Sequence, residues 1–112
     1  MIIVTTQREG AAIMSIEGRL DGQHAQTAEA SFLALTAEGN TRFVFDFSAM
    51  QYISSAGLRV VLVAAKKVRS MQGKLICASM NEQVRDVFEM SGFLSILETA
   101  DSTEEALERL KA

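Results

Sequence analysis

Residues 46–58 read Asp-Phe-Ser-Ala-Met-Gln-Tyr-Ile-Ser-Ser-Ala-Gly-Leu, and they join an expected strand to an expected helix. The strand, residues 42–47, is rich in aromatic and β-branched side chains, which favour a pleated surface. A polar turn and two hydroxyl residues then precede a long run that is compatible with a helix. The sequence therefore predicts a helix over residues 55–71 with Ser54 and Ser55 at its N-terminus.

A helix N-terminus has backbone N–H groups without partners and a partial positive charge, so it accepts a hydroxyl or an anion. A serine in this place is most often an N-cap, which stabilises the helix by about 1 kcal/mol. A second interpretation is that Ser55 is a phosphoryl acceptor. Ala56 and Gly57 follow it and carry little bulk, so another protein can approach the backbone closely.

The composition of the 112-residue chain fits one ordinary domain, and we expect a single domain over residues 1–112 without a linker. The formal charge of -3 comes from interspersed acids and bases, so binding to nucleic acid is not expected. No apolar run is long enough to span a bilayer, and the N-terminus lacks the basic flank of a secretory signal. These features predict a soluble, cytoplasmic protein.

Hydrophobic periodicity predicts strands over residues 2–8 and 12–17, joined by a hairpin turn in which Gly10 has a positive φ. The later expected elements are a helix with Ala25, Ala28, Phe32 and Leu35 on one stripe, the strand 42–47, the helix 55–71, the strand 75–78, a helix capped by Asn81 and closed by Gly92, a strand over 93–97, and a helix that begins with a capping box of Ser102 and Glu105. The order β-β-α-β-α-β-α-β-α predicts an α/β fold with a mixed, mainly parallel sheet of about five strands and about four helices.

The helix 55–71 is apolar on two sides. One stripe holds Leu58, Val61, Leu62, Ala65 and Val68, and a flanking stripe holds Val60, Val63 and Ala64. One stripe faces the sheet; the second is either covered by a neighbouring helix or exposed as a docking surface. The polar border of such a surface would be Arg59, Lys66, Lys67 and Arg69.

Most parts of an enzyme are missing from the sequence. A nucleophile elbow needs glycines on both sides of its serine, whereas Ser55 has only Gly57. His24 is the sole histidine, which leaves a serine hydrolase as a minor alternative and an exposed loop residue as the ordinary interpretation. One histidine and one cysteine are too few for a typical metal site, and no Gly-rich phosphate loop is present. We expect a binding protein with no catalytic residue, metal or cofactor.

Three further side chains have ordinary structural interpretations. Asp21 lies after the second expected strand, where it would be a turn residue or an N-cap. Asp46 ends its strand and would accept backbone N–H groups of the following turn. Cys77 lies among apolar residues and would be an inert thiol of the core.

Taken together, Gly-Arg-Leu-Asp at 18–21, Asp-Phe-Ser at 46–48 and Tyr-Ile-Ser-Ser-Ala-Gly-Leu at 52–58 resemble the bacterial anti-sigma factor antagonists, the STAS-domain family. The resemblance covers nearly the whole chain and includes the strand 74–79 and the segment 84–93. It implies a STAS-type domain that is not an enzyme but a component of signal transduction and transcription regulation.

Members of this family work by partner switching. The unphosphorylated form binds an anti-sigma factor that is also a serine-protein kinase, which releases a sigma factor or another regulated target; phosphorylation ends the binding, and a serine phosphatase restores it. The resemblance places the phosphorylated serine at Ser55, the aspartate of the strand-two loop at Asp21 and the motif glycine at Gly57. The expected partner-binding residues are Asp21, Ser54, Ala56, Gly57, Leu58 and Arg59.

One position departs from the family pattern. Many sporulation and stress-response members have Asp immediately before the phosphorylated serine, whereas this chain has Ser54. The second hydroxyl leaves open which serine is modified, and the regulated target need not be a sigma factor. The alternative function is a STAS-type scaffold, or a module that binds a nucleotide or a lipid, without control by phosphorylation.

Overall fold

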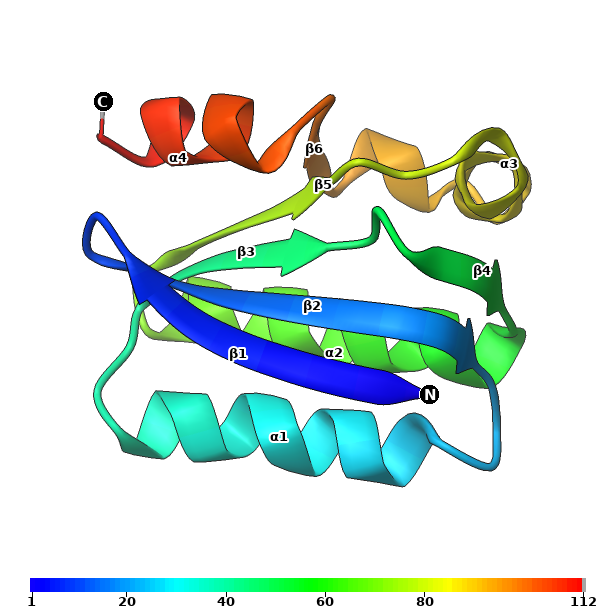
Figure 1. Ribbon diagram of the computed structural model, residues 1–112, viewed down its shortest axis with the longest axis horizontal. Helices are drawn as coiled ribbons and strands as arrows, with labels where there is room; N and C mark the ends of the chain where they lie inside the picture. The colour runs from blue at the N-terminus through cyan, green and yellow to red at the C-terminus, as the bar shows by residue number, and fades with distance from the viewer. Residues whose placement is uncertain (112) are drawn as a thin grey trace.

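The computed structural model describes residues 1–111 and contains a mixed sheet with helices on both faces (Figure 1). The elements in chain order are β1 (Ile2–Arg8), β2 (Ala11–Leu20), α1 (Ala25–Ala37), β3 (Arg42–Asp46), β4 (Met50–Ile53), α2 (Ser55–Ser70), β5 (Lys74–Ala78), α3 (Glu82–Met90), the 3-10 helix η1 (Phe93–Ser95), β6 (Glu98–Ala100) and α4 (Thr103–Lys111). Helices α1 and α2 lie on one face and α4 lies on the other. The predicted α/β class is confirmed.

The strand order is β1-β2-β3-β5-β6, and β4 pairs with β2 beyond the end of β3. The β1–β2 pair is antiparallel, and every other pair is parallel. Glu9 and Gly10 both have a positive φ, at 53° and 81°, as a two-residue hairpin turn of type I′ requires. The predicted hairpin is therefore confirmed, with positive φ at Glu9 as well as at Gly10.

The strand β4 is absent from the sequence-based prediction, and β2 is longer than the predicted 12–17. The two differences have one cause, because the extra residues of β2 pair with β4, from Gly18 opposite Met50 to Leu20 opposite Ile53. Gly18 has a φ of +87° and lies where the register shifts. In a sequence, a glycine beside an apolar run looks like the end of a strand. In the structure, Gly18 is an irregularity within the strand β2.

The last strand is also misplaced in the prediction. Residues 93–97 were expected to form it because they are apolar, but Phe93–Ser95 form η1 and the strand is Glu98–Ala100. Phe93 and Leu94 pack against the core from this short helix instead. The strand β6 has only three residues at the edge of the sheet, and only Ala100 is buried, so its sequence carries almost no hydrophobic signal.

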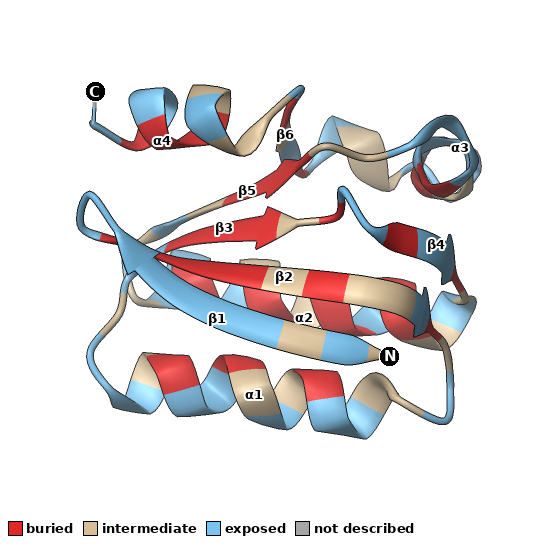
Figure 2. Ribbon diagram, viewed as in Figure 1, coloured by how far each residue is buried: buried red, intermediate tan, exposed pale blue. Residues whose placement is uncertain are grey.

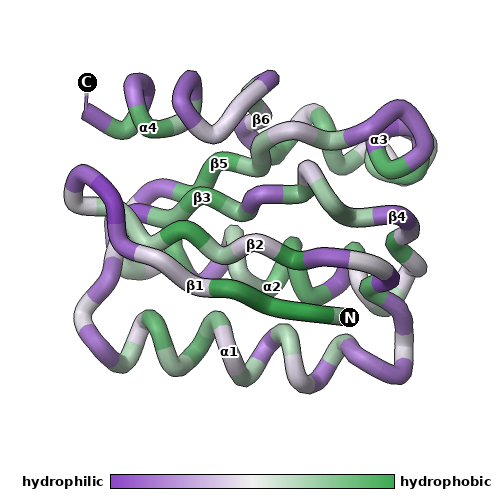
Figure 3. Tube along the Cα trace, in the orientation of Figure 1, coloured by the Kyte–Doolittle hydropathy of each residue, from purple (hydrophilic) through white to green (hydrophobic). Residues whose placement is uncertain are grey.

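The core between the sheet and helices α1, α2 and α3 contains a chain of aromatic contacts. Phe32 of α1 contacts both Phe43 and Phe45 of β3, with ring centroids 5.1 and 5.8 Å apart, and Phe47 links Phe45 to Phe88 of α3. On the other face, α4 covers β3 and β5 with Ala106, Leu107 and Leu110. The buried stripes of the helices and the apolar central strands are visible in Figures 2 and 3.

Cys77 lies in the middle of β5 and is fully buried. Burial disfavours the thiolate and raises the pKa of Cys77 to about 12. The prediction of a core thiol is confirmed.

The two apolar stripes of α2 differ in what covers them. Val60 and Ala64 of the flanking stripe are buried, and α1 packs against α2. The prediction that a neighbouring helix covers the flanking stripe is therefore confirmed for these two residues. On the opposite flank, Leu62 and Ala65 belong to the stripe expected to face the sheet but remain half-exposed.

Polar groups cap the helices as the sequence predicts. Asn81 accepts the N–H of Val84 at 2.8 Å, and Asp46 accepts the N–H of Ser48 at 2.9 Å. Ser102 accepts the N–H of Glu105 at 3.0 Å. These bonds confirm the predicted caps of α3 and α4 and the turn after β3.

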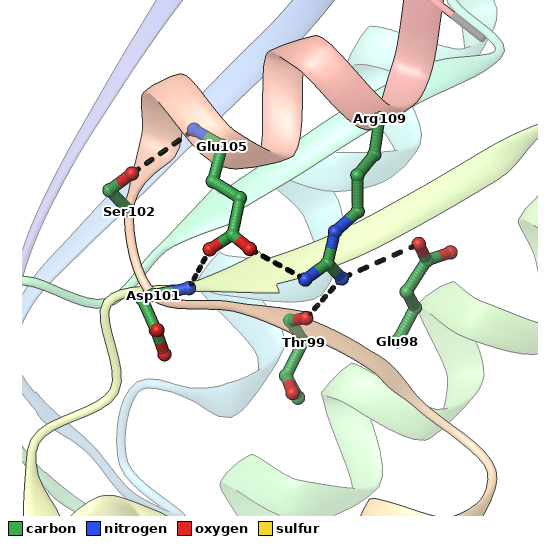
Figure 4. A network of polar contacts seen from close by, with 6 residues as sticks. All are labelled: Glu98, Thr99, Asp101, Ser102, Glu105 and Arg109. Atoms are coloured by element: carbon green, nitrogen blue, oxygen red, sulfur yellow. Dashed lines mark hydrogen bonds and ion pairs between the residues drawn. The ribbon is translucent and has the colours of Figure 1, made fainter.

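The carboxylate of Glu105 joins the start of α4 to β6 (Figure 4). It accepts the N–H of Asp101 at 2.7 Å and is paired with Arg109 at 2.8 Å, and Arg109 also lies 3.7 Å from Glu98. The Asp101 N–H and then the Arg109 guanidinium lower the pKa of Glu105 below its ordinary value of 4.5.

We expect Glu105→Gln to lower the thermal unfolding midpoint at pH 7 and to have a progressively smaller effect as the pH falls below 4.5, the ordinary pKa of the group. A carboxyl group with a lowered pKa in the folded state stabilises the fold above its unfolded pKa, and this stabilisation is lost as the pH falls. Calorimetry of both proteins across this range measures the difference. Glu89→Gln on the exposed face of α3 is the control for charge alone. A difference that does not depend on pH would contradict the assignment.

Candidate functional site

Ser54 is the N-cap of α2. It has extended backbone angles, and its hydroxyl oxygen accepts the N–H of Gly57 at 3.3 Å. Its own N–H donates to the carbonyl of Leu20 at 3.0 Å, and its carbonyl accepts the N–H of Leu58 at 2.9 Å. The side chain and backbone of Ser54 are thus occupied in starting the helix and attaching it to β2.

Ser55 is the first residue of α2, and it is exposed whereas Ser54 is half-buried. Within residues 1–111, its hydroxyl makes no hydrogen bond. The bond that caps the helix is made by Ser54 instead. The first turn of α2 contains no acidic residue. The Ser55 oxygen is therefore an accessible nucleophile at the positive end of a 16-residue helix.

Gly57 is buried at the point where α2 crosses the end of β2. A Cβ atom at this position would overlap the carbonyl oxygen of Leu20 and would lie 2.8 Å from Cγ1 of Ile53. Leu58 is also buried, with 5% of its surface exposed. Gly57 and Leu58, two of the residues expected to contact a partner, thus face the core and pack α2 against the sheet.

The loop after β2 is organised by Asp21. Its carboxylate accepts the N–H of Gln23 at 3.1 Å and lies 2.9 Å from Nδ1 of His24. Burial favours a higher pKa for Asp21, but the hydrogen bonds from His24 and from the backbone outweigh it, so the pKa lies below its ordinary value. Asp21 is thus a charged turn residue. It is not the N-cap of α1, because His24 occupies that position.

His24 was expected to be an ordinary exposed residue, and this expectation is wrong. Its side chain is 31% exposed and its ring is held by Asp21. The contact orders the turn that leads from β2 into α1. The contact uses Nδ1 of the His24 ring.

Arg19 and Tyr52 were not predicted as site residues. The guanidinium of Arg19 lies 4.2 Å from the centre of the Tyr52 ring, and Arg19 Nε lies 3.8 Å from Asp21. The two residues are partners across β2 and β4. Their proximity depends on the strand pairing that was missed, so only a prediction of β4 would have found it.

The Asp21 loop and the start of α2 adjoin one another. A Cβ atom at Gly22 would lie 3.9 Å from Cβ of Ala56. A groove of about 430 Å³ lies between α1 and α2, and it is lined by Gly22, Ala25, Gln26, Glu29, Ala56, Arg59, Val60 and Val63. We call it the inner groove. Of the predicted partner-binding residues, Ala56 and Arg59 line the inner groove, and Asp21 precedes Gly22 in the loop beside it.

Among residues 1–111, no group of three or more histidine, cysteine, aspartate or glutamate side chains is arranged to hold a metal ion. No helix in this range is long and apolar enough to span a bilayer.

Comparison with known proteins identifies relatives along nearly the whole chain. The model of the STAS domain matches residues 3–106. The "Putative anti-sigma factor antagonist BtrV" of Bordetella bronchiseptica is 43% identical over 103 residues, which is 92% of this chain and 89% of that protein.

Solved structures show the same fold. The crystal structure of an anti-sigma factor antagonist from Mycobacterium paratuberculosis matches with a TM-score of 0.91 at 19% identity, covering 99% of this chain and 94% of the other. The Bacillus cell fate determinant SpoIIAA in its phosphorylated form matches with a TM-score of 0.75 at 20% identity, covering 96% and 98%.

Because Ser54 alone caps α2, the two serines should differ in their effect on stability. We expect Ser54→Ala to lower the free energy of unfolding by about 1 kcal/mol, the typical loss for a serine N-cap. Ser55→Ala should change it by less than about 0.5 kcal/mol, as is usual for an exposed side chain. Urea denaturation of the two variants measures the difference. Equal losses would show that the capping is shared.

Gly57→Ala should destabilise the protein strongly, by about 3 kcal/mol or more, because the methyl group would overlap a backbone carbonyl that cannot move independently. The same measurement on Gly22→Ala is the control, since its methyl group would make only an ordinary contact with Ala56. If Gly57→Ala were as stable as the control, α2 would not require the close approach to Leu20.

Proposed function

The chain belongs to the STAS-domain family and is related to anti-sigma factor antagonists, as its sequence indicated, and from this premise we propose that it is a protein-binding switch gated by phosphorylation of Ser55. In its unphosphorylated form it binds an anti-sigma factor that is also a serine kinase, and this binding releases the sigma factor or another regulated target. Phosphorylation ends the binding, and a serine phosphatase restores it. The protein acts as a regulator and not as an enzyme.

The observation that supports Ser55 most directly is the division of roles between the two serines. Ser54 uses its hydroxyl to cap α2, so a phosphoryl group on Ser54 would compete with the bond to Gly57. Ser55 is exposed and its oxygen has no such role. We therefore assign the modification to Ser55, although the preceding residue is Ser54 instead of the aspartate of many family members.

The transfer itself requires no group of this chain beyond the hydroxyl. The Ser55 oxygen would form a bond to the γ-phosphorus of ATP in the kinase, the bond between that phosphorus and the leaving oxygen of ADP would break, and the hydroxyl proton would pass to a base of the kinase. The product carries a charge of about -1.5 to -2 at pH 7.

This charge favours a surface switch over a change of fold. The N-terminus of α2 tolerates an anion, because its N–H groups and the helix dipole attract negative charge. A partner docked over Ser55, Ala56 and the inner groove would have to desolvate that phosphate, and any acidic group opposite it would be repelled. That SpoIIAA, a protein of the same fold, has been solved in a phosphorylated form agrees with a domain that stays folded when modified.

Phosphopeptide mapping of the protein from its own cells is the first test, and we expect phosphate on Ser55. Affinity capture then compares wild type, Ser55→Ala and Ser55→Asp. Wild type and Ser55→Ala should capture a protein with a serine kinase domain, and Ser55→Asp should bind it at least about tenfold more weakly, which corresponds to about 1.4 kcal/mol. The captured kinase should phosphorylate wild type but not Ser55→Ala.

Ser54→Ala is the matched control, because it removes the neighbouring hydroxyl and leaves Ser55 in place. It should still be phosphorylated by the captured kinase, because the hydroxyl of Ser55 is unchanged. Phosphate on Ser54 alone would reject the assignment to Ser55. Equal partner binding by wild type and by Ser55→Asp, with Ser55→Asp folded by calorimetry, would reject the switch.

A further inference from the structure

A second groove lies on the flank of α2 that faces away from α1. It consists of two adjoining hollows of about 350 and 110 Å³ that share Ala65, Arg69 and Ile96. Its lining contains the apolar side chains of Leu62, Ala65 and Ile96 together with the carboxylate of Glu98. The exposed basic side chains of Lys66, Arg69 and Lys74 form what we call its rim. We call it the outer groove.

The topology explains why the outer groove is open. The edge strand β6 has only three residues, and α3 packs against β4 and η1. Within residues 1–111, α1 is the helix that packs extensively against α2, and the outer groove on the other flank is bordered by Ile96 and by β6. Ile96, which follows η1, is 57% exposed and adds an apolar side chain to this groove.

The charge around the outer groove differs from that of the whole chain. Lys66, Arg69 and Lys74 are exposed, and none of them pairs with a carboxylate among residues 1–111. The one acidic side chain in the lining, Glu98, lies 3.7 Å from Arg109 and is thereby partly neutralised. The chain as a whole has a net charge of -3, so the outer groove is a local excess of positive charge.

We propose that the outer groove binds an acidic amphipathic helix of a partner protein. Leu62, Ala65, Lys66 and Arg69 recur along α2 at the spacing of one helix face, so they form a strip about two turns long beside which a second helix can lie. Apolar side chains of that helix would cover Leu62, Ala65 and Ile96. Its carboxylates would pair with the three cations of the rim. This charge complementarity would determine which partner binds and in which orientation.

This surface is separate from the proposed phosphorylation switch. Ser55 lies at the start of α2, and Lys66 lies about 16 Å further along the helix axis at 1.5 Å per residue. The inner and outer grooves lie on different flanks of the buried stripe. Binding in the outer groove should therefore continue whether or not Ser55 is modified, which would keep a partner attached during both states of the switch.

The test uses the full chain and a fluorescein-labelled model helix of about four turns, with leucine along one stripe and glutamate elsewhere. Fluorescence anisotropy should show saturable binding that weakens as salt is added. Lys66→Glu should weaken it about tenfold or more, whereas Arg85→Glu, a charge reversal on the exposed face of α3, should change it less than about twofold. Ile96→Ser should weaken it, and Ile2→Ser at the opposite edge of the sheet should not.

Four results would overturn the proposal. They are no saturable binding, equal binding of a helix with lysine in place of glutamate, unchanged binding by Lys66→Glu, and binding to phosphatidylglycerol vesicles without binding to the model helix. Ser55→Asp distinguishes the two proposals, because it should retain the model helix while losing the kinase. Loss of the model helix in Ser55→Asp would show that the two surfaces are one.

Discussion

The close approach of the start of α2 to the end of β2 is the constraint on which the site depends. The carbonyl of Leu20 receives the N–H of Ser54 and leaves no room for a side chain at Gly57. This packing pulls the first turn of α2 onto the sheet and turns the neighbouring positions, Ser55 and Ala56, outward. It requires that β2 continue past Gly18, so β4 and the irregularity at Gly18 belong to the same arrangement as the exposed serine. The site is thus produced by backbone geometry more than by its own side chains.

This dependence explains what the sequence could predict. The class of fold, the order of the long elements and the start of α2 rest on periodicity and capping over many residues, and those signals are local. The strands β4 and β6 are four and three residues long, and their pairing decides their existence, so no local pattern reveals them. The serine pair at the start of α2 could be located because a hydroxyl at a helix start is a local feature, whereas the choice of Ser55 as the modified residue came from the family resemblance. The inward direction of Gly57 and the contact of Arg19 with Tyr52 depend on β4, and neither could be inferred without it.

The surface of α2 has three different environments. Its buried stripe, with Val61 and Val68, holds the sheet; one flank meets α1; and the other flank is left open with a basic rim. The expectation for the first apolar stripe holds for Leu58, Val61 and Val68, which are buried, but not for Leu62 and Ala65, which are only half-buried. On the open flank, the neighbouring strand β6 has only three residues.

A rigid domain can act as a switch only if the modified residue contributes to binding and not to folding. Ser55 fulfils the second requirement because Ser54 supplies the cap and Gly57 and Leu58 supply the packing. Within residues 1–111, the contacts that hold the start of α2 are made by Ser54, Gly57 and Leu58. A charge on Ser55 would therefore break none of these contacts. In the proposed switch, the free energy of the modification would therefore appear in the complex, as desolvation of phosphate and repulsion at the interface. The proposed switch would then weaken the affinity for a partner seated over Ser55 by about tenfold or more while a surface about 16 Å away along α2 keeps its shape and charge.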